Sequence, residues 1–124
     1  MGFINRIDHV GQLMFATAEG SVTLADIRDH LAVERREGGL QYKELIDARQ
    51  ASPAVSGADV RSIVSWLDAF AREHLLGPTA VVVSTPVAFG MLRMLGFLSE
   101  DFCTIRPFLD LAEAEKWLRD RPKT

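Results

Sequence analysis

The stretch that decides the fold is VVVSTPVAFGMLRMLGFLSE, residues 81–100. It begins with a short run of β-branched residues, turns at Ser84-Thr85-Pro86 and continues as an apolar segment over residues 86–98. The run before the turn is too short for a helix, and it predicts a strand buried on both faces. Pro86 predicts the start of a helix, because the N–H that proline lacks has no helical partner at that position. A strand followed by a helix is the repeating unit of α/β proteins.

The rest of the chain repeats this alternation. Residues 3–20 alternate apolar and small or polar side chains around Val10-Gly11, which predicts an antiparallel hairpin. A helix is expected between Thr23, its cap with Asp26 three residues later, and Gly38. Further helices are expected over residues 58–76, with Leu75 in the core-facing stripe, over 86–98, and from Asp110 onward. Further strands are expected at 44–48, 79–84 and 102–108. We therefore expect a mixed, mainly parallel sheet with an N-terminal antiparallel hairpin and about four helices, residues 1–124 forming one domain.

Composition excludes several classes of protein. The 124 residues are 48% hydrophobic and 25% charged, which is typical of a globular domain. A net charge of −3 argues against a nucleic-acid-binding surface. No apolar run is long enough to cross a membrane, and the N-terminus does not have the pattern of a signal peptide. The single cysteine, Cys103, excludes an internal disulfide and fits a reducing compartment, so we expect a cytoplasmic protein.

This arrangement of elements, together with three segments, resembles the SpoIIAA-like family. The segments are LIDAR at 45–49, VVVSTPVAFGMLRM at 81–94 and AEAEKWL at 112–118. The family consists of small bacterial STAS-type domains, related in fold to anti-sigma-factor antagonists and to lipid-carrying Sec14 domains. The resemblance implies a non-enzymatic regulatory or interaction module, commonly a homodimer. Its Sec14 side implies the alternative, a carrier or sensor for a small apolar or lipid-like molecule.

Ser56 is the one candidate modification site. Antagonists of this family carry a phosphorylatable serine in an Asp-Ser-Ser-Gly turn, and the resemblance places that turn on residues 54–57. Here Ala54 and Val55 replace the aspartate and the first serine, while Ser56 remains. The residue types alone predict that Ser56 caps the following helix, with Asp59 at the third position.

The sequence shows no catalytic or cofactor motif. The histidines at 9, 30 and 74 form no His-x-His, His-Glu-x-x-His or His-x-x-x-His pair, so no metal site is expected. Cys103 lies in a predicted strand and not at a helix start, where a thiol becomes reactive. Asp47 has no paired acid or base in its surroundings, and the glycines form no nucleotide-binding loop. We expect a protein that is not an enzyme and carries no cofactor.

The apolar helix at 86–98 is the main candidate site, because Arg93 is its only charged residue. A surface helix normally keeps one polar side, so an exposed apolar patch is expected here. The candidates for a protein interface or an apolar-ligand surface are Phe89, Met91, Leu92, Arg93, Met94 and Phe97. The composition leaves three interpretations open: association with a second copy or a protein partner, a groove for an apolar ligand, or internal packing.

Overall fold

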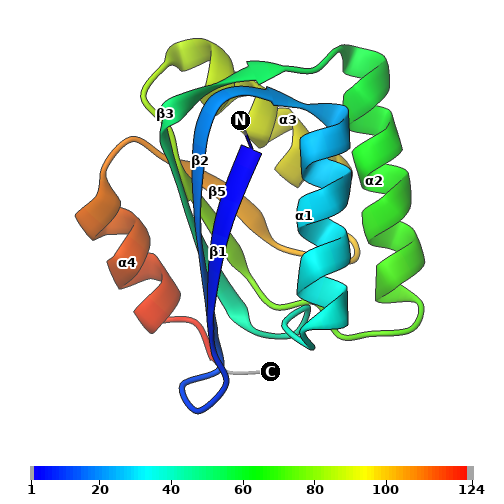
Figure 1. Ribbon diagram of the computed structural model, residues 1–124, viewed down its shortest axis with the longest axis vertical. Coiled ribbons are helices and arrows are strands. Elements are labelled where there is room, and N and C mark those ends of the chain that lie inside the picture. The colour runs from blue at the N-terminus through cyan, green and yellow to red at the C-terminus, as the bar shows by residue number, and fades with distance from the viewer. Residues whose placement is uncertain (1, 123–124) are drawn as a thin grey trace.

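Five strands form one sheet in the order β1-β2-β3-β4-β5, in a computed structural model that describes residues 2–122 (Figure 1). The strands are β1 (Gly2–Asp8), β2 (Leu13–Thr23), β3 (Lys43–Ala54), β4 (Thr79–Val82) and β5 (Ile105–Phe108). The helices are α1 (Leu24–Arg36), α2 (Gly57–Ala71), α3 (Pro86–Leu98) and α4 (Leu111–Arg119). Strands β1 and β2 are antiparallel and all other pairs are parallel, which confirms the predicted mixed sheet.

The helices cover the two faces of the sheet unequally. Helices α1, α2 and α3 lie on one face and α4 lies on the other (Figure 1). Helix α1 packs on β1 and β2, α3 packs on β5, and α2 contacts α1 and α3, while α4 covers β3, β4 and β5. The strand order advances steadily with all three crossover helices on one face, as the uniform handedness of such crossovers requires.

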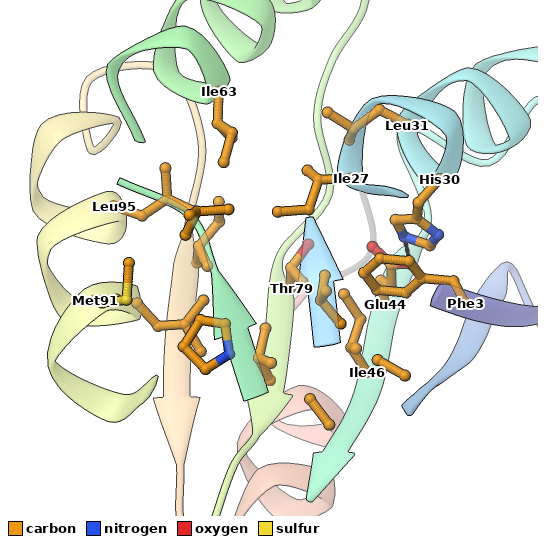
Figure 2. A pocket seen from close by; sticks show the side chains of 18 of the residues that line it. Phe3, Ile27, His30, Leu31, Glu44, Ile46, Ile63, Thr79, Met91 and Leu95 are labelled. Carbon is orange, nitrogen blue, oxygen red and sulfur yellow. Dashed lines mark hydrogen bonds and ion pairs between the residues drawn. The ribbon is translucent and has the colours of Figure 1, made fainter. Parts of the chain in front are cut away.

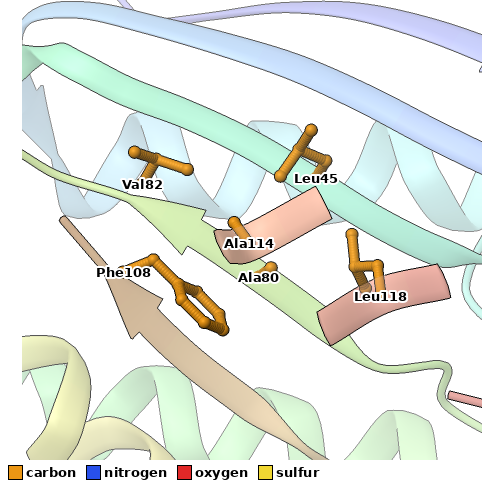
Figure 3. Packing of buried hydrophobic residues seen from close by; sticks show 6 residues of the cluster. All are labelled: Leu45, Ala80, Val82, Phe108, Ala114 and Leu118. Carbon is orange, nitrogen blue, oxygen red and sulfur yellow. The ribbon is translucent and has the colours of Figure 1, made fainter. Parts of the chain in front are cut away.

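Each face of the sheet carries its own apolar cluster. The cluster under α4 contains Leu45, Ala80, Val82, Phe108, Ala114 and Leu118 (Figure 3). The cluster on the opposite face contains Ala16, Ile46, Val81, Val83 and Ala88. Consecutive residues of β3 and β4 thus belong to different clusters, because side chains alternate along a strand. Strand β4 is buried on both faces, as its sequence predicts.

The helix starts agree with their sequence patterns. Thr23 and Ser56 each accept a hydrogen bond from the N–H of the third helical residue, and that residue's carboxylate accepts one in return. These are the two predicted capping boxes, each worth about 1 kcal/mol. Helix α3 begins at Pro86 with Thr85 as its N-cap.

Strands β2 and β3 are longer than predicted. Strand β2 continues past Gly20 to Thr23, and β3 runs to Ala54 through residues that read as a loop. The two extensions pair with each other, Val22 lying opposite Pro53, after an irregularity in the register near Thr17. Proline is tolerated because this half of β3 pairs with β2 alone, since β4 reaches only residues 44–47.

Helix α2 is shorter than predicted, and β5 starts later. The helix ends at Ala71, and Leu75, which the helical stripe places in the core, is 61% exposed. The residues after Ala71 instead return the chain to the sheet, where the Gly77 N–H donates to the Leu40 carbonyl at 2.9 Å. Cys103 lies in the loop before β5 and not within a strand.

Two glycines of α3 have opposite surroundings. A Cβ atom on Gly96 would lie 2.5 Å from the carbonyl oxygen of Ile105 on β5. A Cβ atom on Gly90 would meet no atom within 4 Å. Gly96 therefore allows α3 to approach the backbone of β5 closely, whereas Gly90 has no such role.

This difference predicts opposite effects for the same substitution in one helix. Gly96→Ala should lower the free energy of unfolding by about 1–3 kcal/mol, because helix and strand must move apart. Gly90→Ala should raise it by about 0.5–1 kcal/mol, since alanine favours an exposed helical position. Urea denaturation of both variants measures the two changes. A Gly96→Ala protein as stable as wild type would contradict the close contact.

Candidate functional site

An apolar cavity of about 200 Å³ lies between the sheet and helices α1, α2 and α3 (Figure 2). Its walls include Ile27 and Leu31 of α1, Val60 and Ile63 of α2, Met91 and Leu95 of α3, and Ile46 and Val81 of the sheet. It lies where α2 spans the space between α1 and α3. Beneath it β2 contributes the small residue Ala18 and β3 contributes Ala48.

The size of the cavity limits what it can hold. It exceeds the roughly 150 Å³ of an engineered apolar cavity that admits benzene. It is smaller than the ~300 Å³ at which pockets for drug-sized ligands begin. A small apolar molecule, or one segment of an acyl chain, matches this volume.

Three ionisable side chains line the cavity at the end away from α3. His30 and Glu34 lie one turn apart on α1, and Glu44 reaches them from β3. Figure 2 shows His30 and Glu44 side by side. The Nε2 atom of His30 is 2.9 Å from Oε1 of Glu34 and 2.8 Å from Oε2 of Glu44. All three side chains are buried, with exposed fractions between 4% and 7%. We call His30, Glu34 and Glu44 the buried triad.

The sheet and an aromatic ring fix the position of the triad. Phe3 of β1 stacks on the imidazole of His30, with ring centroids 4.3 Å apart and planes 20° apart. Phe3 is opposite Ala18 of β2, whose small side chain shares the face under α1. The backbone N–H of Glu44 donates to the carbonyl of Pro78 at 2.9 Å, which holds the start of β3.

Burial and mutual contact shift the pKa values of two of these groups. Burial by itself lowers the pKa of His30, but the hydrogen bonds and charges of Glu34 and Glu44 outweigh it and raise the pKa to about 10. Burial raises the pKa of Glu34 to about 8, with a further contribution from the charge of Glu44 and partial opposition from His30. Both shifts favour the protonated forms, an imidazolium at His30 and a neutral carboxyl at Glu34.

The hydrogen bonding of the triad is incomplete. The Nε2 atom of His30 lies within hydrogen-bonding distance of two carboxylates, although an imidazole nitrogen carries one N–H at most. The other ring nitrogen, Nδ1, is buried and has no hydrogen-bond partner among residues 2–122. The same holds for Oδ1 of Asn5 on β1.

The structure divides the six candidates of the apolar helix into two groups. Met91 and Leu92 line the cavity, and Phe89 and Leu92 pack against the cluster that contains Ile46 and Val81. Arg93, Met94 and Phe97 lie on the outer side of α3, where Met94 is 41% and Phe97 70% exposed. The prediction that Phe89 and Leu92 belong to an exposed patch is wrong, because these half-buried side chains lie on the side of α3 that faces the sheet.

Exposed apolar residues continue along the outer side of α3. Val87 and Leu98 are exposed there with Met94 and Phe97. Within residues 2–122 no helix combines the length and the apolar character needed to cross a lipid bilayer.

The remaining residues singled out in the sequence lie apart from the cavity, except Cys103. Ser56 caps α2 through its hydroxyl. Asp47 forms a two-point ion pair with Arg49, at 2.9 and 2.8 Å, which lowers the pKa of Asp47. His9 hydrogen-bonds Tyr42 at 2.9 Å. Cys103 lines the cavity, and burial raises the pKa of its thiol.

Sequence reasoning missed the buried triad. Histidine-pair spacings do not reveal the triad, because the pair here is His30 and Glu34, four residues apart on one helical face. A second indication is Glu44, a carboxylate at the start of an apolar strand whose burial requires a partner. Neither pattern alone reveals that His30 and Glu44, which are 14 positions apart in the sequence, are in contact.

Comparisons with known proteins support the fold. No protein-family model matches the chain, and no curated protein matches it. Among solved structures, it is similar to the crystal structure of an uncharacterised protein of the DUF3478 family with a SpoIIAA-like fold, from Shewanella loihica PV-4. The two share 16% identity with a TM-score of 0.63, over 94% of each chain. The chain thus has the SpoIIAA-like fold that its sequence indicates.

The pKa values of the triad predict how stability depends on pH. Because the folded pKa of Glu34 is raised, the unfolded chain loses this proton first, and stability should fall as pH rises from about 5 to about 8. The raised pKa of His30 acts in the same direction, since its contribution is complete below about 6.5 and is lost toward about 10. Urea denaturation in metal-free buffer at a series of pH values measures this loss.

Glu34→Gln isolates the carboxyl group. Glutamine mimics the protonated acid, so the variant should fold and should reduce the loss of stability between pH 5 and 8 by more than about 1 kcal/mol. Glu115→Gln, at an exposed position of α4, should leave the profile of the wild type unchanged. Identical pH profiles for Glu34→Gln and wild type would show that Glu34 is ionised in the folded protein.

Proposed function

We propose that this domain is a non-enzymatic module that binds a small apolar molecule in the cavity between the sheet and helices α1–α3. The observation that carries the proposal is the cavity itself, which is lined by apolar side chains from three helices and the sheet. The Sec14 side of the family resemblance supports the same ligand class. The cargo would be an aromatic ring, a short aliphatic molecule or part of an acyl chain.

Energetics favour a ligand in this space. Apolar side chains that face an unfilled space lack the van der Waals contacts that they would make in a packed core. An apolar ligand restores the lost van der Waals contacts without requiring the helices to move closer to the sheet.

A binding role, as opposed to catalysis, fits the chemistry of the cavity wall. Cys103 is the thiol there, and its raised pKa makes it a poorer nucleophile. The hydrogen bonds of the His30 ring go to carboxylates and not to a hydroxyl or thiol that it could activate.

Two methionines of α3 allow a matched test. Met91 lines the cavity, whereas Met94, one turn later, lies on the outer side of the helix. Met91→Trp should fill the cavity and weaken binding of a fluorescent acyl-chain probe by at least about tenfold, which is about 1.4 kcal/mol. Met94→Trp should bind the probe as wild type does. Fluorescence titration with folded variants provides the measurement.

The outcome of that titration separates the alternatives. Native mass spectrometry of freshly purified wild type should in addition show a retained small-molecule mass. Equal probe affinities for Met91→Trp and Met94→Trp would place the probe outside the cavity and contradict the proposal. A wild type that neither retains a ligand nor binds the probe would contradict it as well.

A second candidate function is a regulatory module that acts as a homodimer, or with a protein partner, through the outer side of α3. The supporting observation is the row of exposed apolar side chains at Val87, Met94, Phe97 and Leu98. Such a patch on one helix suits a two-fold interface, because the same surface then serves both copies. Arg93 lies beside these residues and could pair with a carboxylate at the rim.

Phe97→Glu tests this second candidate. A carboxylate in the middle of the patch should convert a dimer to folded monomer, because burial of an unpaired charge costs several kcal/mol. Leu109→Glu is the control, since Leu109 is similarly exposed but lies outside α3. Sedimentation velocity gives the mass and far-UV circular dichroism the folding. A wild type that is monomeric at all accessible concentrations would rule out the dimer.

A further inference from the structure

We propose that His30, Glu34 and Glu44 form a binding site for one divalent transition-metal ion of the Zn²⁺ type. The proposal starts from the convergence of one imidazole nitrogen and two carboxylates, whose potential ligand atoms all lie within 4.8 Å of one another. Two of these residues come from one face of α1 and the third comes from β3, so the site would join a helix to the sheet. The site does not depend on what occupies the apolar cavity.

The distances between these atoms suit a small ion after a minor adjustment. The two nitrogen–oxygen distances are 2.8 and 2.9 Å. An ion with bonds of about 2.0–2.2 Å in tetrahedral geometry requires ligand atoms about 3.2–3.6 Å apart. The side chains would therefore separate by roughly half an ångström.

The two carboxyl groups of the site could balance the charge of a divalent cation. Two carboxylates share one imidazole, and the ion pairs that Glu34 and Glu44 form among residues 2–122 are with His30. Lys43, the neighbour of Glu44 in β3, points to the opposite face and donates to the carbonyl of Leu118. A divalent ion would displace the protons held by His30 Nε2 and by Glu34, and would then balance both carboxylates at once.

The donor set and its surroundings select the type of metal. One nitrogen and two carboxylate oxygens suit zinc and its neighbours, whereas Mg²⁺ and Ca²⁺ prefer all-oxygen sites with more ligands. Apolar side chains such as Phe3, Ile27 and Leu31 line the same part of the cavity, so a low coordination number fits the space. The three residues line the cavity, so a fourth position would face it and could take water or a polar group.

The imidazole is oriented for this role. A metal at Nε2 leaves the proton on Nδ1, which is buried without an acceptor among residues 2–122, so the ring does not have the hydrogen bond that usually orients a metal-bound histidine. Stacking on Phe3 holds the plane of the ring, with Nε2 directed at the two carboxylates.

The test uses the full chain, freed of metal by a chelator and dialysed. Calorimetric titration with Zn²⁺ should show one ion per chain, bound more tightly than a micromolar dissociation constant, and Zn²⁺ should raise the melting temperature. Co²⁺ in place of Zn²⁺ should give the intense visible absorption of a low-coordinate site. These three measurements need no variant.

Matched variants locate the site. Glu44→Gln and Glu34→Gln each remove one carboxylate at nearly constant shape and should weaken Zn²⁺ binding at least about tenfold. His9→Gln and His74→Gln remove the two exposed histidines and should leave the affinity unchanged. If circular dichroism shows that one glutamine variant is unfolded, the titrations of the wild type and of the other variant still decide whether the triad binds Zn²⁺.

Three results would overturn the proposal. The first is a wild type that binds no Zn²⁺ at micromolar concentration. The second is loss of binding in His9→Gln or His74→Gln, which would mark an adventitious surface site. The third is unchanged Zn²⁺ affinity in folded Glu34→Gln and Glu44→Gln, which would show that the three side chains bind one another and not a metal.

Discussion

The burial of Glu44 at the start of β3 is the constraint on which the attachment of α1 to the sheet depends. The first four residues of β3 are buried although the strand starts with a lysine and a glutamate, so both charges need partners inside the protein. Lys43 finds a backbone carbonyl of α4 on one face, and Glu44 finds His30 of α1 on the other. An unpaired charge at either position would cost several kcal/mol. These polar contacts therefore fasten a helix to each face at neighbouring positions of one central strand.

The cavity follows from how the three helices are supported. Helix α1 is held at the sheet by the triad and by Phe3, and α3 is held against β5 at Gly96. Helix α2 contacts these two helices, and its side chains Val60 and Ile63 line the cavity. The middle helix thus rests mainly on its two neighbours, and the cavity lies beneath it.

Features governed by neighbouring residues could be predicted from the sequence. The capping pairs Thr23 with Asp26 and Ser56 with Asp59, the start of α3 at Pro86 and the buried strand β4 all depend on residues a few positions apart. These local patterns were sufficient for the order of elements, and with it the fold.

What the sequence did not reveal depends on contacts between distant segments. Strand β3 extends to Ala54 because β2 offers a partner, and this pairing overrides the loop composition around Pro53. The six candidates on α3 could not be divided into inner and outer groups, since nearly all sides of that helix are apolar. The buried triad required knowledge that one face of α1 lies over the start of β3.

The two edges of the sheet differ in a way that limits assembly. The carbonyls of Thr104, just before β5, and of Phe108 at its end accept from the N–H groups of Thr79 and Val83. Because residues alternate in direction along a strand, Pro107 lies on the outer edge, where it offers no N–H. The carbonyl of Ile105 is covered by α3 at Gly96. Strand β1, with seven residues, is the edge at which another strand could be added. A sheet that can grow at one edge alone stops at two copies, so strand addition by itself cannot build an open-ended polymer of this fold.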